Sequence, residues 1–223
     1  RLIRRILTIG FTPFIIIAMD NVMIITMNAI LQKYGGAARG DLLITCATIA
    51  QSFMLVVTMS LGGITSGTQA VLAYNFGAGN TDRVKGAQKY IFILAAAYTT
   101  LLFILARTVG GLFVRLFTSD PTVAAEALRA IRIFTLAIIP LAFQYEIVDG
   151  FTGLGQVQVA LPLSFFRKGL YFVSLFLLPA MFGAEAAFFA EPVSDIAGPV
   201  VSAIVYIVSM KGILAKKHQI GRA

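Results

Sequence analysis

Cysteine, histidine and charged residues are all scarce in this sequence, and each shortage excludes a class of function. The one cysteine, Cys46, cannot form an internal disulfide. The one histidine, His218, lies near the C-terminus, and it leaves no histidine-based metal site and no catalytic triad. Only 13% of the residues are charged, whereas soluble domains have about 25%. No phosphate-binding loop is visible either. The sequence therefore predicts neither an enzyme, nor a cofactor site, nor a soluble domain.

The chain consists instead largely of long apolar runs. Hydrophobic residues make up 58% of the sequence, and the mean hydropathy is +0.88. A membrane-spanning helix needs about 20 predominantly apolar residues. We therefore expect an all-α integral membrane protein in which six transmembrane helices form a single lobe over residues 1–223. The approximate spans are 6–31, 42–74, 90–106, 122–151, 157–182 and 186–210.

The basic residues lie mainly at the ends of these runs and not in one stripe. The net charge is +8, but its distribution favours a lipid bilayer as the partner and not a nucleic acid. Six spans place both termini on one side, and that side receives twelve of the eighteen Lys and Arg residues. By the positive-inside rule, we expect a multi-pass protein of the plasma (inner) membrane with both termini in the cytoplasm.

Two carboxylates in the fourth span are candidates for ion or proton coupling. Each ionised group inside a membrane costs about 2.5–3.5 kcal/mol, so its presence suggests a function. Glu146 and Asp149 are three residues apart and share a helix face, where they could share a proton or hold a cation. The alternative is that both are solvated at the membrane boundary or paired with Arg167 and Lys168.

Two further carboxylates complete this set of coupling candidates. Asp195 lies between Pro192 and Pro199, where the interrupted helical ladder leaves backbone groups for it to bind or a cavity for it to line. Asp20 lies near the middle of the first span, next to Asn21, and could alternatively be a hydrogen-bonded strut between helices. For Asp195, a structural role and a functional role are equally consistent with this position.

Other polar residues in the spans receive weaker predictions. Gln69, Gln144 and Asn21 are candidates for the polar wall of a substrate cavity, although an interhelical hydrogen bond is favoured for Gln69. Glu191 is expected to be solvated near the outer boundary. No firm metal site emerges from these residues.

The stretch 61–80 is rich in glycine and ends in the sequence YNFGAGN. Small residues, Gly67 among them, should let another helix approach closely. Gly77 and Gly79 permit a turn, after which Asn80 or Thr81 should cap a new helix. Residues 81–89 then form a basic amphipathic segment at the membrane interface. The structural motif comprises Gly67, Gln69, Asn75, Gly77, Gly79 and Asn80.

The run from Gly67 to Lys85, GTQAVLAYNFGAGNTDRVK, strongly resembles a signature in the second half of multidrug and toxic compound extrusion (MATE) transporters. Further matches follow in the expected order. They are Leu116–Pro121, Ala127–Ile133, Pro140–Gln144, Gly153–Gly155 and Pro192–Asp195.

This resemblance implies a fold and a function. MATE transporters contain two six-helix lobes, and the chain resembles the C-terminal lobe, with the N-terminal lobe absent. The resemblance implies export of small organic, often cationic, substrates in exchange for Na⁺ or H⁺. It also implies a partner for this lobe, either the missing N-terminal lobe or a second copy of this chain. It places Asp195 at an acidic position of the family. The alternatives are a flippase-like exporter of a lipid-linked precursor and a non-transporting membrane subunit.

Overall fold

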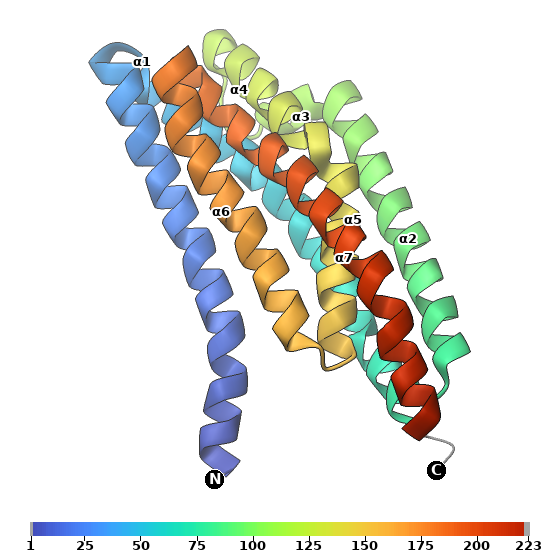
Figure 1. Ribbon diagram of the computed structural model, residues 1–223. Coiled ribbons are helices and arrows are strands. Elements are labelled where there is room, and N and C mark those ends of the chain that lie inside the picture. The colour runs from blue at the N-terminus through green and yellow to red at the C-terminus, as the bar shows by residue number, and fades with distance from the viewer. Residues whose placement is uncertain (1, 221–223) are drawn as a thin grey trace.

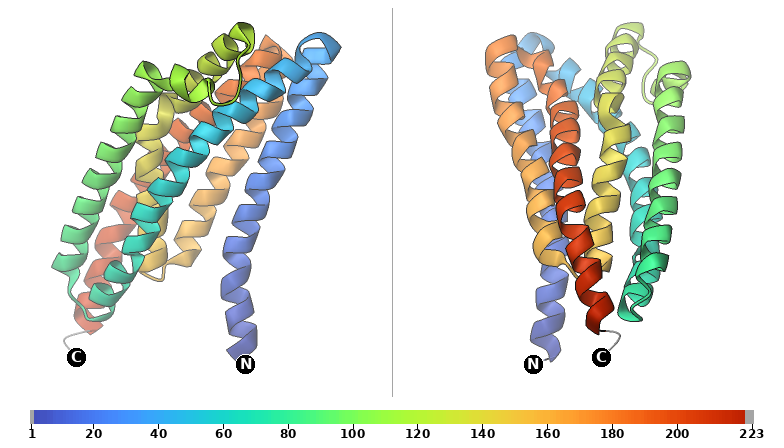
Figure 2. Two further views of the ribbon diagram at one scale, coloured as in Figure 1. Left: turned by 180° about the vertical axis from the view of Figure 1, so that it is seen from behind. Right: turned by 45° about the vertical axis from the view of Figure 1, so that its right-hand side comes forward.

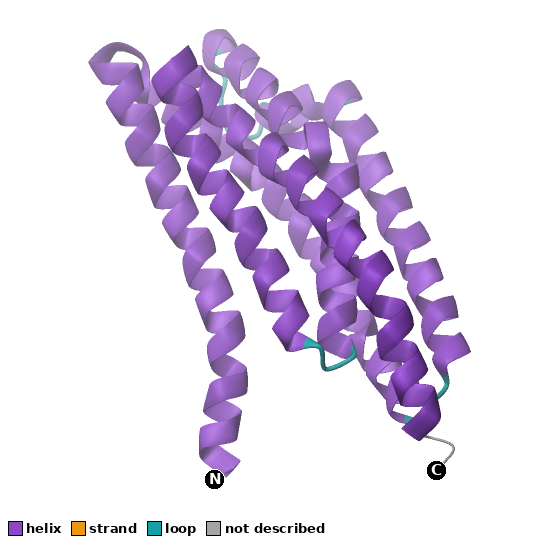
Figure 3. Cartoon of the chain, in the orientation of Figure 1, coloured by secondary structure: helices purple, strands orange, loops and turns teal. Residues whose placement is uncertain are grey.

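The computed structural model describes residues 2–220, apart from the side chains of residues 2–17, 38 and 215–220. The described chain is almost entirely helical, which confirms the all-α prediction (Figures 1 and 3). Its elements are α1 (Leu2–Gly77), α2 (Thr81–Thr108), α3 (Gly110–Val114), α4 (Pro121–Phe134), η1 (Thr135–Ala137), α5 (Ile138–Gly153), α6 (Val157–Phe182), η2 (Ala184–Phe189) and α7 (Ala190–Ile220).

Five segments within the described residues are long and apolar enough to cross a membrane. They are Arg39–Gly77, Thr81–Thr108, Pro121–Gly153, Val157–Phe182 and Ala184–Leu214. Much of the predicted first span, 6–31, falls on side chains outside the described part of the chain. The long helices pack side by side in one bundle, and α1 begins at the same end of the bundle at which α7 finishes (Figures 1 and 2).

Helix α1 contains two helical segments that meet at Gly36. This glycine has φ +61°, a left-handed conformation that costs least at glycine. Its neighbour Gly35 lies so near the next turn that an added Cβ would be 2.9 Å from the Cα of Gly40. The chain therefore reverses direction sharply, and the part before Gly36 runs back along the bundle beside α6 (Figure 1), with Met27 and Leu31 buried in the core.

The turn between α1 and α2 forms where the YNFGAGN sequence predicts it, but its contacts differ in detail. Gly79 has φ +75°, and the amide of Asn80 donates to the carbonyl of Asn75 at 2.9 Å. Asn80 occupies the N-cap position without a side-chain capping bond, so the prediction of side-chain capping by this residue was wrong. Backbone hydrogen bonds hold the turn instead.

The predicted close approach of a helix to Gly67 was also wrong within the described chain. A Cβ added there would meet no atom within 4 Å. The close contact occurs two residues later, at Gln69, and the glycine that permits it belongs to α5: a Cβ on Gly153 would lie 3.2 Å from the carbonyl oxygen of Gln69. The small residue that allows the two backbones to meet is therefore on α5.

The fourth predicted span begins as expected and is interrupted near its proline. Asp120 caps α4 by accepting hydrogen bonds from the amides of Thr122 and Val123, at 2.7 and 3.3 Å, and Pro121 follows in the first turn. The 3₁₀ segment η1 separates α4 from α5 just before Pro140. Proline lacks an amide proton and its ring clashes with the preceding turn, which explains why the break occurs there.

Candidate functional site

Two adjoining cavities lie between α1, α5, α6 and α7, and three side chains line both of them. The first cavity has a volume of about 210 Å³ and the second about 190 Å³. Asp20, Tyr145 and Arg167 belong to both linings. The remaining polar residues of the first cavity are Gln51, Thr58, Tyr171 and Glu191, and those of the second are Ser66, Gln144, Asp149, Ser164 and Lys168. Because the cavities share walls, an occupant of one changes the surroundings of the other.

Asp149 lines the second cavity and is held by the glycine-rich part of α1. Its Oδ2 accepts hydrogen bonds from Thr65 Oγ1 at 2.5 Å and from Ser66 Oγ at 3.1 Å. Gln69 of the same helix lies close to this carboxylate. A carboxylate beside two hydroxyl groups is the kind of oxygen-rich site that holds a small cation or a proton.

The two basic residues of α6 are buried and form ion pairs with other carboxylates. Lys168 Nζ contacts Asp20 Oδ1, and Arg167 Nη1 donates to Asp195 Oδ1 at 2.7 Å. These pairs connect α6 to α1 on one side and to α7 on the other. The charge count assigned Arg167 and Lys168 to the basic residues on one side of the membrane, and this assignment was wrong, because they occupy the middle of α6. The ion pairs seen among the described residues join these two bases to Asp195 and Asp20 and not to Glu146 or Asp149.

Glu191 departs from its predicted position as well. It is only partly exposed and lines the first cavity together with Asp20 and Arg167. The outer-boundary prediction assumed that the sixth span begins at residue 186, but the short η2 segment tucks the start of α7 into the bundle. Glu191 therefore contributes a carboxylate to the first cavity, a position that the sequence did not predict.

Glu146 lies deeper in the bundle than Asp149 and does not line either cavity. Its side chain is fully buried, and neither carboxylate oxygen has a hydrogen-bond partner among the described residues. The space beside Gly150 lies between Glu146 and Gln88: a Cβ there would be 3.7 Å from Glu146 Oε1 and 3.0 Å from Gln88 Nε2. Of the four coupling candidates, Asp20 and Asp149 line cavities, whereas Glu146 and Asp195 are buried behind them.

The three predicted cavity-wall residues occupy different positions. Gln144 lines the second cavity but also joins three helices, because its Oε1 accepts from Ser202 at 2.6 Å and its Nε2 donates to the Leu163 carbonyl at 3.4 Å. Gln69 is partly buried beside Asp149, and Asn21 is exposed on α1 next to Asp20.

Gly198 of α7 gives Arg167 the room that its ion pair requires. A Cβ added at Gly198 would lie 2.8 Å from Cγ and 3.0 Å from Cβ of Arg167. We expect Gly198→Ala to displace the Arg167 stem and to destabilise the protein by about 1–3 kcal/mol, the usual cost of overpacking. Thermal unfolding in detergent measures this effect. Gly212→Ala is the matched control, because a Cβ at Gly212 meets nothing within 4 Å; equal midpoints for the two variants would contradict the packing argument.

Several site residues could not be recognised from the sequence. Thr65 and Ser66 look like ordinary small polar residues of an apolar helix, and only their distance to Asp149 gives them a role. Arg167 and Lys168 carried a usable signal, since two adjacent bases in the middle of an apolar run need buried partners.

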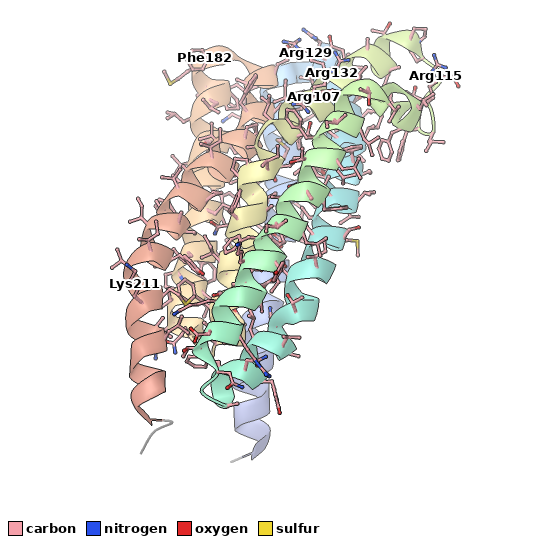
Figure 4. All side chains as sticks on the ribbon, turned by 90° about the vertical axis from the view of Figure 1, so that its right-hand side faces the viewer. Arg107, Arg115, Arg129, Arg132, Phe182 and Lys211 are labelled. Atoms are coloured by element: carbon pink, nitrogen blue, oxygen red, sulfur yellow. The ribbon has the colours of Figure 1, made fainter. Side chains whose placement is uncertain are left out.

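A second ionic cluster lies away from the cavities. In this cluster, Arg39 and Arg129 both contact Glu185, at 2.8 and 2.9 Å. Arg129 lies at the same end of the bundle as Arg107, Arg115 and Arg132, and Lys211 lies toward the opposite end (Figure 4). These exposed pairs tie α1, α4 and η2 together and contribute little to stability individually.

Comparisons with known proteins agree on one family. The family model described as MatE matches residues 17–178. The "Multidrug export protein MepA" of Staphylococcus aureus (strain N315) is 23% identical over 184 residues, which are 82% of this chain and 39% of that protein.

Solved structures resemble the fold over nearly the whole chain. One is the "Outward-facing conformation of a multidrug resistance MATE family transporter of the MOP superfamily", with a TM-score of 0.84, 14% identity and coverage of 93% of this chain and 46% of that one. The inward-facing conformation described in the same words gives a TM-score of 0.81 at 14% identity, covering 95% and 48%. The chain thus spans about half the length of the structures that it matches.

Proposed function

Because the chain belongs to the MatE family, we propose that it forms one half of a transporter that exports organic cations in exchange for Na⁺ or H⁺. The observation that supports this proposal is the pair of adjoining cavities that share Asp20, Tyr145 and Arg167. Antiport requires that the substrate and the coupling ion exclude each other. Two cavities with a common wall provide this exclusion, since a cation in one opposes a cation in the other.

Within this proposal the second cavity takes the coupling ion and the first takes the substrate. Asp149, with Thr65 and Ser66 around it, binds Na⁺ or H⁺. The first cavity sets the carboxylate of Glu191 among apolar and aromatic walls, a surface suited to an organic cation, while Asp20 in the same lining is paired with Lys168. Neutralising Asp149 lowers the negative charge in the adjoining cavity and so weakens substrate binding.

The other half of the transporter is the missing N-terminal lobe or a second copy of this lobe. We further propose that the protein resides in the plasma (inner) membrane with both termini in the cytoplasm. Leaving out Arg167 and Lys168, which lie inside the bundle, the predicted cytoplasmic side still carries ten basic residues against six.

A flippase for an anionic lipid-linked precursor receives less support. Such a cavity needs free basic groups for a pyrophosphate, but Arg167 is paired with Asp195 and Lys168 with Asp20. A non-transporting subunit would have no need for carboxylates around two cavities.

The test of coupled export uses the natural full-length protein in reconstituted vesicles loaded with ethidium. We expect efflux when an inward Na⁺ or H⁺ gradient is imposed and little efflux without one, because the gradient supplies the free energy for export. Ethidium fluorescence measures the rate, and collapsing the gradient with an ionophore is the control. Efflux at the same rate with and without both gradients would contradict the proposal.

A further inference from the structure

The basic segment 81–89 takes no part in the cavities described above, and it borders a groove of its own. The groove lies between the first turns of α2 and residues 206–214 of α7, and its volume is about 550 Å³. It is lined by Thr81, Asp82, Lys85, Tyr206, Ile207, Met210, Lys211 and Leu214. Both helix segments lie at the same end of the bundle (Figure 1).

The inner wall of this groove is rigid. Tyr206 donates a hydrogen bond from its hydroxyl to Oε1 of the buried Gln88 at 3.1 Å. Its ring packs edge-on against Phe92, with centroids 5.9 Å apart, and against Phe151 at 6.0 Å. A tyrosine held on both its polar and its apolar side presents a fixed surface to whatever occupies the groove.

The rim of the groove is positively charged. Lys85 reaches it from α2 and Lys211 from α7, whereas Asp82 is the one acidic residue of the lining. Asp82 pairs with Lys85 at 3.5 Å, but both side chains are largely exposed, and such a pair holds its partners weakly. Lys211 forms no ion pair with the described residues. The rim therefore favours an anionic group.

The outer side of the groove is apolar and faces away from the bundle. Ile207 is 67% exposed, and its neighbour Val208 is 74% exposed. Tyr90, the residue directly after the basic segment on α2, is 73% exposed. Lysines next to exposed tyrosine and aliphatic side chains, at the end of two spanning helices, have the arrangement of a membrane–water interface. An occupant must therefore be anionic at one end and apolar along its length.

We propose that this groove binds an acidic phospholipid. The headgroup phosphate lies between Lys85 and Lys211, and one acyl chain runs along Tyr206 and Ile207 toward the middle of the membrane. Basic pockets between spanning helices on the cytoplasmic side are a recurrent way to hold anionic lipids. The site is independent of the two cavities, so the proposal stands or falls separately from the transport function.

The experiment uses a tryptophan placed in the groove as a reporter. The sequence contains no tryptophan, so Ile207→Trp adds one reporter to this chain, and the natural full-length protein without the substitution supplies the background signal. The protein is reconstituted in phosphatidylcholine vesicles that contain a minor fraction of either dibrominated phosphatidylglycerol or dibrominated phosphatidylcholine. Bromine quenches the reporter only at short range, so a difference between the two brominated lipids at equal mole fraction measures which headgroup the groove prefers.

We expect phosphatidylglycerol to quench the reporter at about one-fifth of the mole fraction that phosphatidylcholine requires. This is the preference expected when one net positive charge near the membrane surface attracts an anionic headgroup. The variant Lys85→Gln/Lys211→Gln should lose this preference. The variant Lys33→Gln/Lys89→Gln removes the same charge outside the groove lining and should keep it.

Three results would overturn the proposal. Equal quenching by the two lipids in the parent protein would show that the groove does not select an acidic headgroup. Quenching by neither lipid would show that a protein segment covers the groove. A preference that survives Lys85→Gln/Lys211→Gln would likewise remove the lysines from the site.

Discussion

Replacing Asp149 with asparagine is expected to lower gradient-driven ethidium efflux by at least about tenfold. The substitution removes a full negative charge and leaves an amide of nearly the same shape among Thr65, Ser66 and Gln69. A single charge about 4 Å from a cation contributes about 4 kcal/mol near a protein surface, so its loss should abolish ion binding at this position. The initial rate of efflux from vesicles under a Na⁺ or H⁺ gradient measures the effect.

Two other variants make this result specific. Asp41→Asn changes an exposed carboxylate of the same helix bundle and should leave efflux unchanged. Glu146→Gln alters a carboxylate that is buried behind the cavity, and we expect a smaller loss of efflux than for Asp149→Asn. Wild-type efflux in Asp149→Asn, at a normal protein level, would exclude Asp149 from coupling. A larger loss in Glu146→Gln would move the coupling site deeper into the bundle.

Replacing Arg167 with methionine is expected to destabilise the protein by about 3–5 kcal/mol, because the substitution leaves the fully buried Asp195 without its counter-ion. The Oδ2 atom of Asp195 already lacks a hydrogen-bond partner among the described residues, and the contact that Oδ1 keeps, from the Ser194 hydroxyl at 3.5 Å, supplies no counter-charge. Unfolding of the purified protein in mixed detergent, followed by circular dichroism, measures the change.

The double variant Arg167→Met/Asp195→Leu separates the ion pair from general packing. Replacing both members of a buried pair by apolar groups of similar size often costs little, so this variant should recover most of the stability that Arg167→Met loses. A double variant as unstable as the single one would mean that Arg167 acts through its contacts with Gly198 and not through its charge. An unchanged stability of Arg167→Met would contradict the importance of the pair altogether.

Much of the fold follows from local properties of the chain. The positions of Asp120, Pro121 and Pro140 predict where α4 begins and where the ladder breaks, because capping and the missing proline amide act within one or two helical turns. The turn at Gly79 is local in the same way. The MATE resemblance, carried by the run from Gly67 to Lys85, is confirmed by the MatE match.

The site was less predictable, because its contacts join residues far apart in the chain. Lys168 pairs with Asp20 across 148 positions, and Thr65 bonds Asp149 across 84. Spacing along one helix predicted that Glu146 and Asp149 share a face. It could not predict that the hydroxyl groups of Thr65 and Ser66 bond to Asp149 and not to Glu146. The placement of Glu191 depended on how η2 folds back, which hydropathy alone does not reveal.

The sequence by itself indicated an all-α membrane protein that resembles the MATE family, and it located local features such as the cap at Asp120 and the turn at Gly79. Those properties depend on hydrophobicity, caps and turns, which act over short distances along the chain. Only the tertiary structure decided which buried charges neutralise one another, and therefore which carboxylates remain available to a cavity. The physical reason is that a charge in a membrane is tolerated only beside a partner, and the helix that supplies the partner is set by packing. The glycine-rich stretch combines both kinds of information: its turn is local, whereas its hydroxyl groups acquire a role only when α5 brings Asp149 to them.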